Sequence, residues 1–157
     1  MHVQRDGTDG GASVEEPTDL RMHPDAVAAF LEQQGWGCLT LADGGSAYSI
    51  PISFGYDGDG TVYFHVHTDD DGEKMRYLDA TATATFLVAD VQPPEWTSVM
   101  LRGAVTRVPD DETPEAYAAF ADNAWFPMCP WVPEKDPSEL AFYKLDADDV
   151  TGRTSML

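Results

Sequence analysis

The chain has 157 residues, which is most simply one domain with a single sizeable core. Its 28 acidic residues against nine basic ones give a formal net charge of −19, so repulsion excludes nucleic acid and anionic membranes as partners. The acid is spread along the chain, and the aromatic content is too high for a disordered acidic segment. We interpret the charge as adaptation to the high-salt cytoplasm of a halophile, where screening weakens self-repulsion.

The sequence predicts a soluble, cytoplasmic protein. No apolar run approaches the length of a membrane span, and the N-terminus has no apolar signal segment. The two cysteines, Cys38 and Cys129, form no CxxC pair, which favours a reduced compartment. Residues 1–18 are almost without apolar side chains and are expected to form a flexible acidic leader, followed by a single domain over 19–157.

Regular structure is predicted from residue 24 onward. A short helix begins at Pro24, where Val27, Phe30 and Leu31 repeat at helical spacing. Gly35 can end this helix.

The pattern then changes to the alternation that is typical of strands. Strands are expected over 36–42, 46–54, 61–66, 82–89, 98–108 and 140–145, and helices over 73–79 and 113–125. Short Gly/Asp turns separate the first three strands, as in hairpins. These elements predict a mainly β fold, a small six-stranded antiparallel β-barrel with a few peripheral helices, whose closure removes exposed edges.

Alternation also divides the strands into inward and outward faces. The inward sets are Tyr48, Ile50, Ile52 and Phe54, then Val62, Phe64 and Val66, then Val99, Leu101 and Val105. The outward sets are Ala47, Ser49, Pro51 and Ser53, then Tyr63, His65 and His67, then Ser98, Met100 and Arg102. A mid-strand proline such as Pro51 requires an edge strand or an unpaired N–H. The outward faces carry few charges, so they can hold a flat ligand or be a solvated surface with small residues by chance.

The segment 63–74, YFHVHTDDDGEK, raises the question of a metal or an anion site. His65 and His67 share a face, but a closed zinc site needs two more ligands, and no HExxH or paired CxxC supplies them. No metal site is therefore predicted. Lys74, one of three lysines, stands at a helix start where its charge opposes the helix dipole, and Gly72 permits close backbone approach. This pattern favours an anionic cofactor.

Several blocks of the sequence, by their order and spacing, resemble the pyridoxamine 5′-phosphate oxidase-like flavoproteins with the FMN-binding split barrel. The blocks are GWGCLTLA (35–42), AYSIPISFGYDGDGTVYFHVH (47–67), GEKMRYL (72–78), ATFLVAD (84–90), WTSVMLRGAVTRV (96–108) and DDVTGR (148–153). Within that family the chain looks most like the small nitroimidazole-reductase-type proteins. The resemblance implies a split barrel over 19–157 that forms a homodimer with FMN at the subunit interface.

The resemblance also implies a set of cofactor-binding residues. Ser49, Ile50, Pro51, Ile52 and Ser53 are expected along the isoalloxazine ring, His65, Val66 and His67 beside the ribityl phosphate, Lys74 in a pair with that phosphate, and Trp96 and Ser98 at one side of the flavin. No catalytic residue is predicted, because no dedicated acid–base pair is visible in the sequence.

The function implied by the resemblance is that of an FMN-dependent oxidoreductase acting on a small organic substrate. Relatives bind the deazaflavin F420 or haem instead, so a non-catalytic binder of flavin, F420 or haem is the alternative. The substrate-binding Arg and His of a true pyridoxamine 5′-phosphate oxidase have no match in the C-terminal YKLDADDVTGR, and vitamin B6 synthesis is not predicted.

Overall fold

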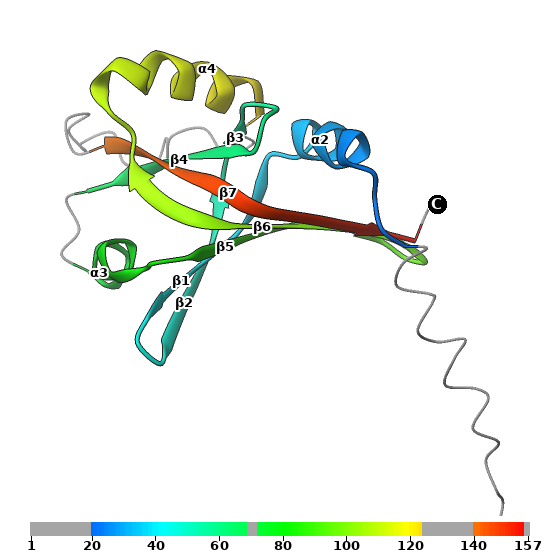
Figure 1. Cartoon of the computed structure of the whole chain (residues 1–157), viewed down its shortest axis with the longest axis horizontal. Helices are drawn as coiled ribbons and strands as arrows, with labels where there is room; N and C mark the ends of the chain where they lie inside the picture. The colour runs from blue at the N-terminus through cyan, green and yellow to red at the C-terminus, as the bar shows by residue number, and fades with distance from the viewer. Residues whose placement is uncertain (1–19, 69–71, 124–139, 156–157) are drawn as a thin grey trace, which may run out of the picture.

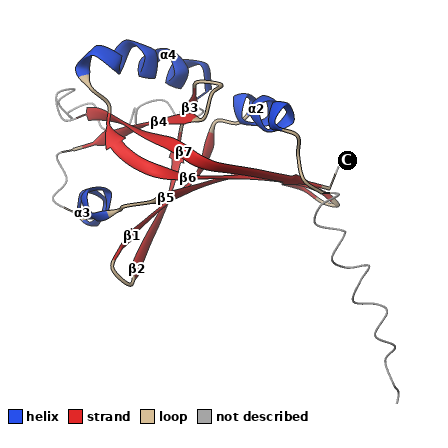
Figure 2. Cartoon of the chain, in the orientation of Figure 1, coloured by secondary structure: helices blue, strands red, loops and turns tan. Residues whose placement is uncertain are grey.

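The computed structural model describes residues 20–68, 72–123 and 140–155, and the strands in these ranges form one antiparallel sheet. They are β1 (Trp36–Asp43), β2 (Ser46–Ser53), β3 (Gly55–Tyr56), β4 (Thr61–His67), β5 (Ala84–Gln92), β6 (Glu95–Arg107) and β7 (Leu140–Thr154). Their order across the sheet is β2-β1-β5-β6-β7-β4-β3 (Figures 1 and 2). The predicted mainly β, antiparallel fold is confirmed.

The sheet curls into a split barrel. β2 and β3 lie at opposite edges of the sheet, although Phe54 alone separates them in the chain. One residue spans less than about 4 Å, so the two edges must meet at Phe54, which is fully buried. There β2 and β4 are in contact without being hydrogen-bonded neighbours. We call this line of contact the seam.

The described ranges contain seven strands, one more than predicted. The strand expected over 46–54 ends at Ser53, and the two-residue β3 follows it. Helix α4 (Thr113–Asn123) packs on β3 so closely that a Cβ atom at Gly55 would lie 2.3 Å from the backbone nitrogen of Phe120. A glycine at residue 55 is what lets the helix backbone approach the sheet.

The core lies on the predicted inward faces. Phe54, Phe64 and Phe86 are fully buried, and their rings meet edge to face with centroids 5.1 and 5.0 Å apart. Val62, Val66, Val99 and Leu101 are buried with them, while Tyr48, Ile50, Ile52 and Val105 pack against this core from partly buried positions. The inward half of the face prediction is therefore confirmed.

Among the described residues, three helices and one 3-10 turn flank the sheet. α2 (Pro24–Gln33) packs on β7, α3 (Glu73–Ala80) packs on β1 and β2, and η1 (Asp110–Glu112) leads into α4, which lies over β3 and β4 (Figure 1). Each of the three α-helices matches a predicted helix, except that the last two residues expected in the helix over 113–125 lie outside the described residues, and η1 was not predicted. No helix in the described ranges has the length and apolar character needed to cross a membrane.

The last strand is longer than predicted. It was expected over 140–145 but continues to Thr154, pairing with β4 in its first half and with β6 over most of its length. The register shifts where Arg102 lies opposite Asp149 and Gly103 opposite Ala147, which leaves Asp148 as a bulge. The bulge lets an Asp-rich segment continue as a strand.

Candidate functional site

The seam is the first feature of the candidate site. β4 is hydrogen-bonded to β7 and to the two residues of β3, so its last residues meet β2 without a ladder. In the ladder between β3 and β4, Gly55 lies opposite Tyr63. Extended back through Phe54, this register directs Ser53 toward His65. The seam brings together the two strands that carry eight of the predicted site residues, Ser49, Ile50, Pro51, Ile52, Ser53, His65, Val66 and His67.

Helix α3 carries Lys74 beside these strands. Lys74 lies in the first turn of α3 and is partly buried. The ring of Tyr77 stacks on that of Tyr48 with the centroids 5.3 Å apart, and the Thr81 hydroxyl accepts a hydrogen bond of 3.0 Å from the Ala42 N–H. These contacts fix α3 against β1 and β2, so Lys74 lies on a helix that packs beside β2.

The edge position predicted from Pro51 is confirmed. β2 is hydrogen-bonded to β1 alone, so its second edge carries no ladder. A proline at residue 51 is compatible with such an edge, because it has no N–H to contribute.

The outward face of β4 differs from the prediction, because α4 covers it. Tyr63 was expected on an open face, but it is 5% exposed and packs with Val108, Ala116 and Phe142. The prediction of an open outward face is wrong for this residue. The alternation was correct, but α4 adds a second, smaller core on that side of the sheet. The sequence of a strand does not show whether a distant helix will cover it.

His65 lies beneath the same helix. Its ring stacks on that of Phe142 with the centroids 4.3 Å apart and meets the rings of Tyr117 and Phe120 on α4. Burial, with a smaller contribution from the nearby His67, lowers the pKa of His65 below its ordinary value. The backbone of His65 borders the seam, but its imidazole is directed into an aromatic cluster.

A second outward surface, over β2, β1, β5 and β6, is not covered by any described helix. We call it the open outer face, and its residues are Ser49, Pro51, Cys38, Thr40, Thr85, Leu87, Ser98 and Met100. Leu87 is 37% exposed, and the hydroxyl oxygens of Thr40 and Ser49 lie 3.0 Å apart in a hydrogen bond. This surface combines apolar and hydroxyl side chains, as the outward sets predicted.

Besides Met100, which the outward sets included, four members of this face were not among the predicted site residues. They are Cys38, Thr40, Thr85 and Leu87. The strand register aligns Pro51, Cys38, Leu87 and then Met100 across four neighbouring strands. Alternation within residues 36–42 and 82–89 places these side chains on the outward face. Their alignment across neighbouring strands depends on the strand register, which the sequence does not specify.

Trp96 and Ser98 are not brought to the seam of the same chain. Both lie on β6, and two strands, β5 and β1, separate β6 from β2. At about 4.8 Å per strand this is roughly 14 Å along the sheet. The Trp96 N–H donates a 2.9 Å hydrogen bond to the Ser155 hydroxyl, which ties this end of β6 to β7. Within one chain the predicted site residues therefore form two groups, one on β2, β4 and α3 and the other on β6.

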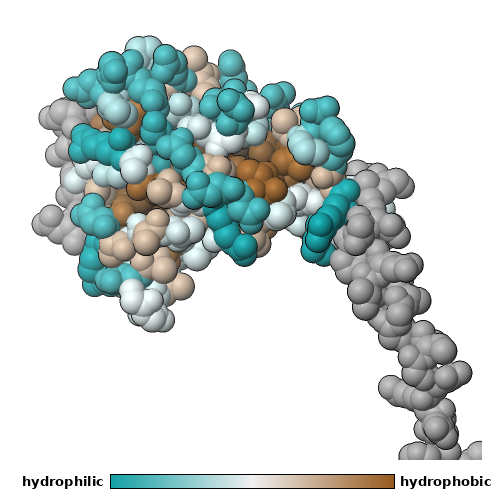
Figure 3. Space-filling model, viewed as in Figure 1, coloured by the Kyte–Doolittle hydropathy of each residue, from teal (hydrophilic) through white to brown (hydrophobic). Residues whose placement is uncertain are grey.

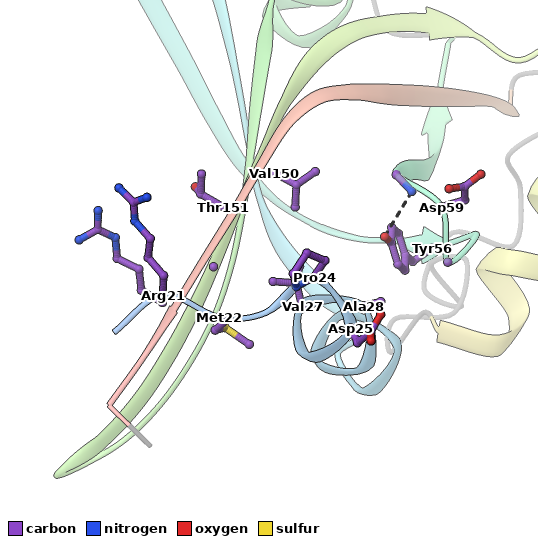
Figure 4. Close-up of a pocket in the computed structure, with 14 residues that line it drawn as sticks. Arg21, Met22, Pro24, Asp25, Val27, Ala28, Tyr56, Asp59, Val150 and Thr151 are labelled. Carbon is purple, nitrogen blue, oxygen red and sulfur yellow. Dashed lines mark hydrogen bonds between the residues drawn. The ribbon is translucent and has the colours of Figure 1, made fainter. Parts of the chain in front are cut away.

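A cleft in the described structure lies apart from the seam. It measures about 650 Å³ between α2, the β3–β4 turn and the last part of β7, and Met22, Val27, Tyr56 and Val150 line it (Figure 4). Figure 3 shows hydrophobic side chains exposed in a hollow beside α2. No predicted site residue lines this cleft. Its size suits a small ligand, but its position does not connect it with the seam.

No group of three His, Cys, Asp or Glu side chains within the described ranges is arranged to hold a metal ion. The described part of the seam offers backbone groups of an edge strand, and the neighbouring α3 carries one lysine. Such groups bind and orient a ligand, but they do not form a nucleophile–base pair.

Comparison with known proteins identifies the family. A family model described as pyridoxamine 5′-phosphate oxidase matches residues 23–154. The chain belongs to this family. The match covers every described helix and all strands, so the split barrel is the fold of the family. No curated protein sequence matches the chain.

Solved structures of several proteins share the fold at low identity. An FAD-binding protein from Mesorhizobium loti has a TM-score of 0.68 and 21% identity, over 86% of this chain and 96% of that one. A proposed 5-nitroimidazole antibiotic resistance protein from Bacteroides thetaiotaomicron has a TM-score of 0.66 and 20% identity, over 86% of each chain. A haem-binding protein from Mycobacterium smegmatis has a TM-score of 0.64 and 20% identity, over 83% of this chain but only 54% of that one.

Proposed function

We propose that this chain is a flavin-dependent oxidoreductase that binds FMN along the seam and acts on a small organic substrate. One observation carries the proposal: in a member of the pyridoxamine 5′-phosphate oxidase family, β2 has an edge without a ladder and contacts both β4 and α3, the helix that carries Lys74. Structural relatives named for flavin binding support the choice of cofactor.

The residues at the seam fit a flavin nucleotide. The edge of β2 that lacks a ladder has backbone groups that can hydrogen-bond the polar rim of a flat ring, over Ser49–Ser53. Lys74 supplies a cation for a phosphate, and the N-cap Gly72 brings no side-chain acceptor to the first turn of α3. The isoalloxazine, when bound, supplies the hydride chemistry. The chain's own part is to bind and orient the ring and to exclude water from it.

A second copy of the chain can supply the missing half of the site. Trp96 and Ser98 lie three strand spacings from β2 of their own chain, and the open outer face between them is apolar and weakly charged. In a two-fold homodimer the same face meets itself, so each seam can receive residues from the partner's β6. The proposed dimer therefore explains why one chain separates the two groups.

Flavin is favoured over haem by the position of His65. A haem-binding role for this histidine requires a free imidazole nitrogen at an open pocket. The ring of His65 instead stacks on Phe142 beneath α4. F420, like FMN, carries a phosphate and a flat ring, so titration has to separate these two.

The test is a cofactor titration with two variants. Purified protein should bind FMN with flavin absorption bands, and Lys74→Ala should weaken binding by roughly 1.5–3 kcal/mol, because a charge-assisted contact to phosphate is lost. His67→Ala should cost about 1 kcal/mol, the value of a neutral hydrogen bond. Equal affinity for the wild type and Lys74→Ala removes Lys74 from the site, and a protein that takes up neither FMN nor F420 overturns the proposal.

The alternative function is non-catalytic storage or sensing by a flavin, F420 or haem binder, as the haem-binding relative suggests. Turnover separates the two. An enzyme should accept electrons from NAD(P)H or reduced F420 and pass them to a quinone, a nitro compound or oxygen. A flavin-loaded protein that does neither is a binder only.

A further inference from the structure

Two arginines lie directly opposite each other at the end of the sheet. Arg21 forms an antiparallel bridge with Arg153 of β7. The flanking backbone hydrogen bonds, donated by Met22 over 2.9 Å and by Thr154 over 3.0 Å, make this a non-hydrogen-bonded pair. In such a pair the Cβ atoms lie about 4.5–5.5 Å apart, which is the closest approach that an antiparallel ladder gives to two side chains.

Both side chains point to the outer side of the sheet. Gly152 faces α2, since a Cβ atom there would lie 2.7 Å from the Val27 side chain, so the next residue, Arg153, faces the other way. Figure 4 shows Arg21 on that side of β7, away from α2. The pair therefore continues the surface that carries Ser98, which lies opposite Arg153 on β6.

The pair has an electrostatic cost that the described structure does not offset. Like charges directly opposite each other destabilise a sheet. Within the described ranges neither arginine forms an ion pair, although the chain has 28 acidic residues for nine basic ones. Arg102, on the same side of β6, does reach a carboxylate, with 3.9 Å to Asp149. Both arginines are exposed, so their guanidinium groups are accessible to an external anion.

We propose that Arg21 and Arg153, with the hydroxyl group of Ser98, bind a phosphate group of a ligand. Two guanidinium groups present several N–H donors in planar forks, which match the oxygens of a phosphate, and a serine hydroxyl adds one more. The inference deepens the proposed function, since Ser98 belongs to the proposed cofactor site. The phosphate belongs to the substrate or to the flavin bound at the partner's seam, and the experiment separates these sources.

The primary experiment titrates inorganic phosphate into the full-length, cofactor-free protein by calorimetry. The wild type should bind phosphate, and Arg21→Gln and Arg153→Gln should each weaken binding by at least about tenfold. Arg102→Gln is the matched control, because it removes a cation from the same side of the sheet that already has a partner, and its affinity should stay within about twofold of the wild type. No phosphate binding by the wild type, or an equal loss in all three variants, overturns the proposal.

Thermal unfolding gives a second measurement that does not depend on flavin. Without phosphate, each glutamine variant should unfold at a higher temperature than the wild type, because the like-charge repulsion is gone. Added phosphate should raise the unfolding temperature of the wild type more than that of either variant, since only the wild type binds the anion tightly. Equal protection of all the proteins contradicts the site.

The source of the phosphate follows from titrations with riboflavin and FMN. If Arg153→Gln weakens FMN but leaves riboflavin unchanged, the pair holds the cofactor phosphate; if both affinities are unchanged, it holds a phosphate of the substrate. Both results are consistent with the site, and the phosphate titration alone decides against it. A protein that binds phosphate but no flavin retains this site and overturns the proposed function, so the two failures are distinguishable.

Discussion

The two outward surfaces of the sheet follow the same strand alternation but differ in what lies over them. The covered outer face, with Tyr63, His65, Phe142 and Lys144, lies beneath η1 and α4, whereas the open outer face has no described helix above it. Tyr63 is 5% exposed and Leu87 is 37% exposed. Alternation decides the side on which a residue points, but the helix that covers a side comes from elsewhere in the chain. Uncovered apolar side chains are therefore better markers of a binding surface than outward position alone.

The covered outer face has a polar network of its own. The Glu112 carboxylate accepts a 2.9 Å hydrogen bond from the Lys144 ammonium and a 3.3 Å hydrogen bond from the Tyr63 hydroxyl. Burial, and then the charge of Glu112, raises the pKa of Tyr63 to about 12, and the hydrogen bond to Glu112 raises the pKa of Lys144. These groups stabilise one another, so the covered face has a structural role.

The largest expected effect comes from displacing α4 from β3. Gly55→Ala places a methyl group 2.3 Å from the backbone of α4, and we expect it to lower the free energy of unfolding by about 3 kcal/mol. Gly45→Ala is the matched control, because nothing lies within 4 Å of a Cβ atom there. Urea unfolding of both variants measures the difference, and equal stabilities would show that α4 does not pack on β3 as described.

A comparison of two ion pairs sharpens the contrast between the faces. Glu112→Ala leaves the largely buried Lys144 with only a longer contact of 4.0 Å to Asp146 and should cost about 2 kcal/mol. Arg102→Ala breaks an exposed pair with Asp149, which is worth about 0.5 kcal/mol. Chemical unfolding of the two variants provides the measurement. Similar losses of stability in the two variants would mean that burial beneath η1 and α4 does not strengthen the ion pair between Lys144 and Glu112.

The open outer face is tested by a charge at its centre. In the proposed dimer, Leu87→Glu would bury a carboxylate in an apolar interface, so dimer dissociation should become at least about tenfold easier. Ala118→Glu, at an exposed position on α4, should leave the association unchanged. Analytical ultracentrifugation at several protein concentrations separates the two variants. A Leu87→Glu protein that associates like the wild type places the dimer interface elsewhere.

The smallest expected effect concerns pH. Because the pKa of His65 is lowered in the folded protein, the unfolded chain takes up this proton first as pH falls below about 6.5, and stability is lost. His65→Phe keeps a ring against Phe142 and should lose less stability than the wild type between about pH 7.5 and about pH 5.5. His23→Asn, at an exposed N-cap, should follow the wild type. Thermal unfolding across this range gives the slopes.

Much of the fold could be predicted from local patterns. Alternation identified the inward residues Phe54, Phe64 and Leu101, because side chains on one strand face have to share one environment. The edge position of β2 followed from Pro51, which has no N–H for a ladder. These inferences needed only the chemistry of single strands.

Other features depended on distant parts of the chain. The length of β7 was missed because its second half is rich in aspartate, which is depleted in strands, and the pairing with β6 overrides that preference. The cover over Tyr63 was missed because α4 lies about fifty residues further along the chain. For the candidate site, the family resemblance implied the residues on β2 and β4, but the distance between β2 and Ser98 follows from strand order. Strand order is a non-local property that alternation does not encode.

The place of β7 in the sheet has a consequence for how the protein is made. The hairpins β1–β2 and β5–β6 pair residues that are near in sequence, whereas Thr61 of β4 lies opposite Asp146 of β7. β4 therefore has only the two residues of β3 as a ladder until β7 leaves the ribosome, and β6 also keeps an open edge until then. Closure of such a long loop is slow. A nascent chain of this topology needs protection from aggregation through most of its synthesis, and its high negative charge provides it.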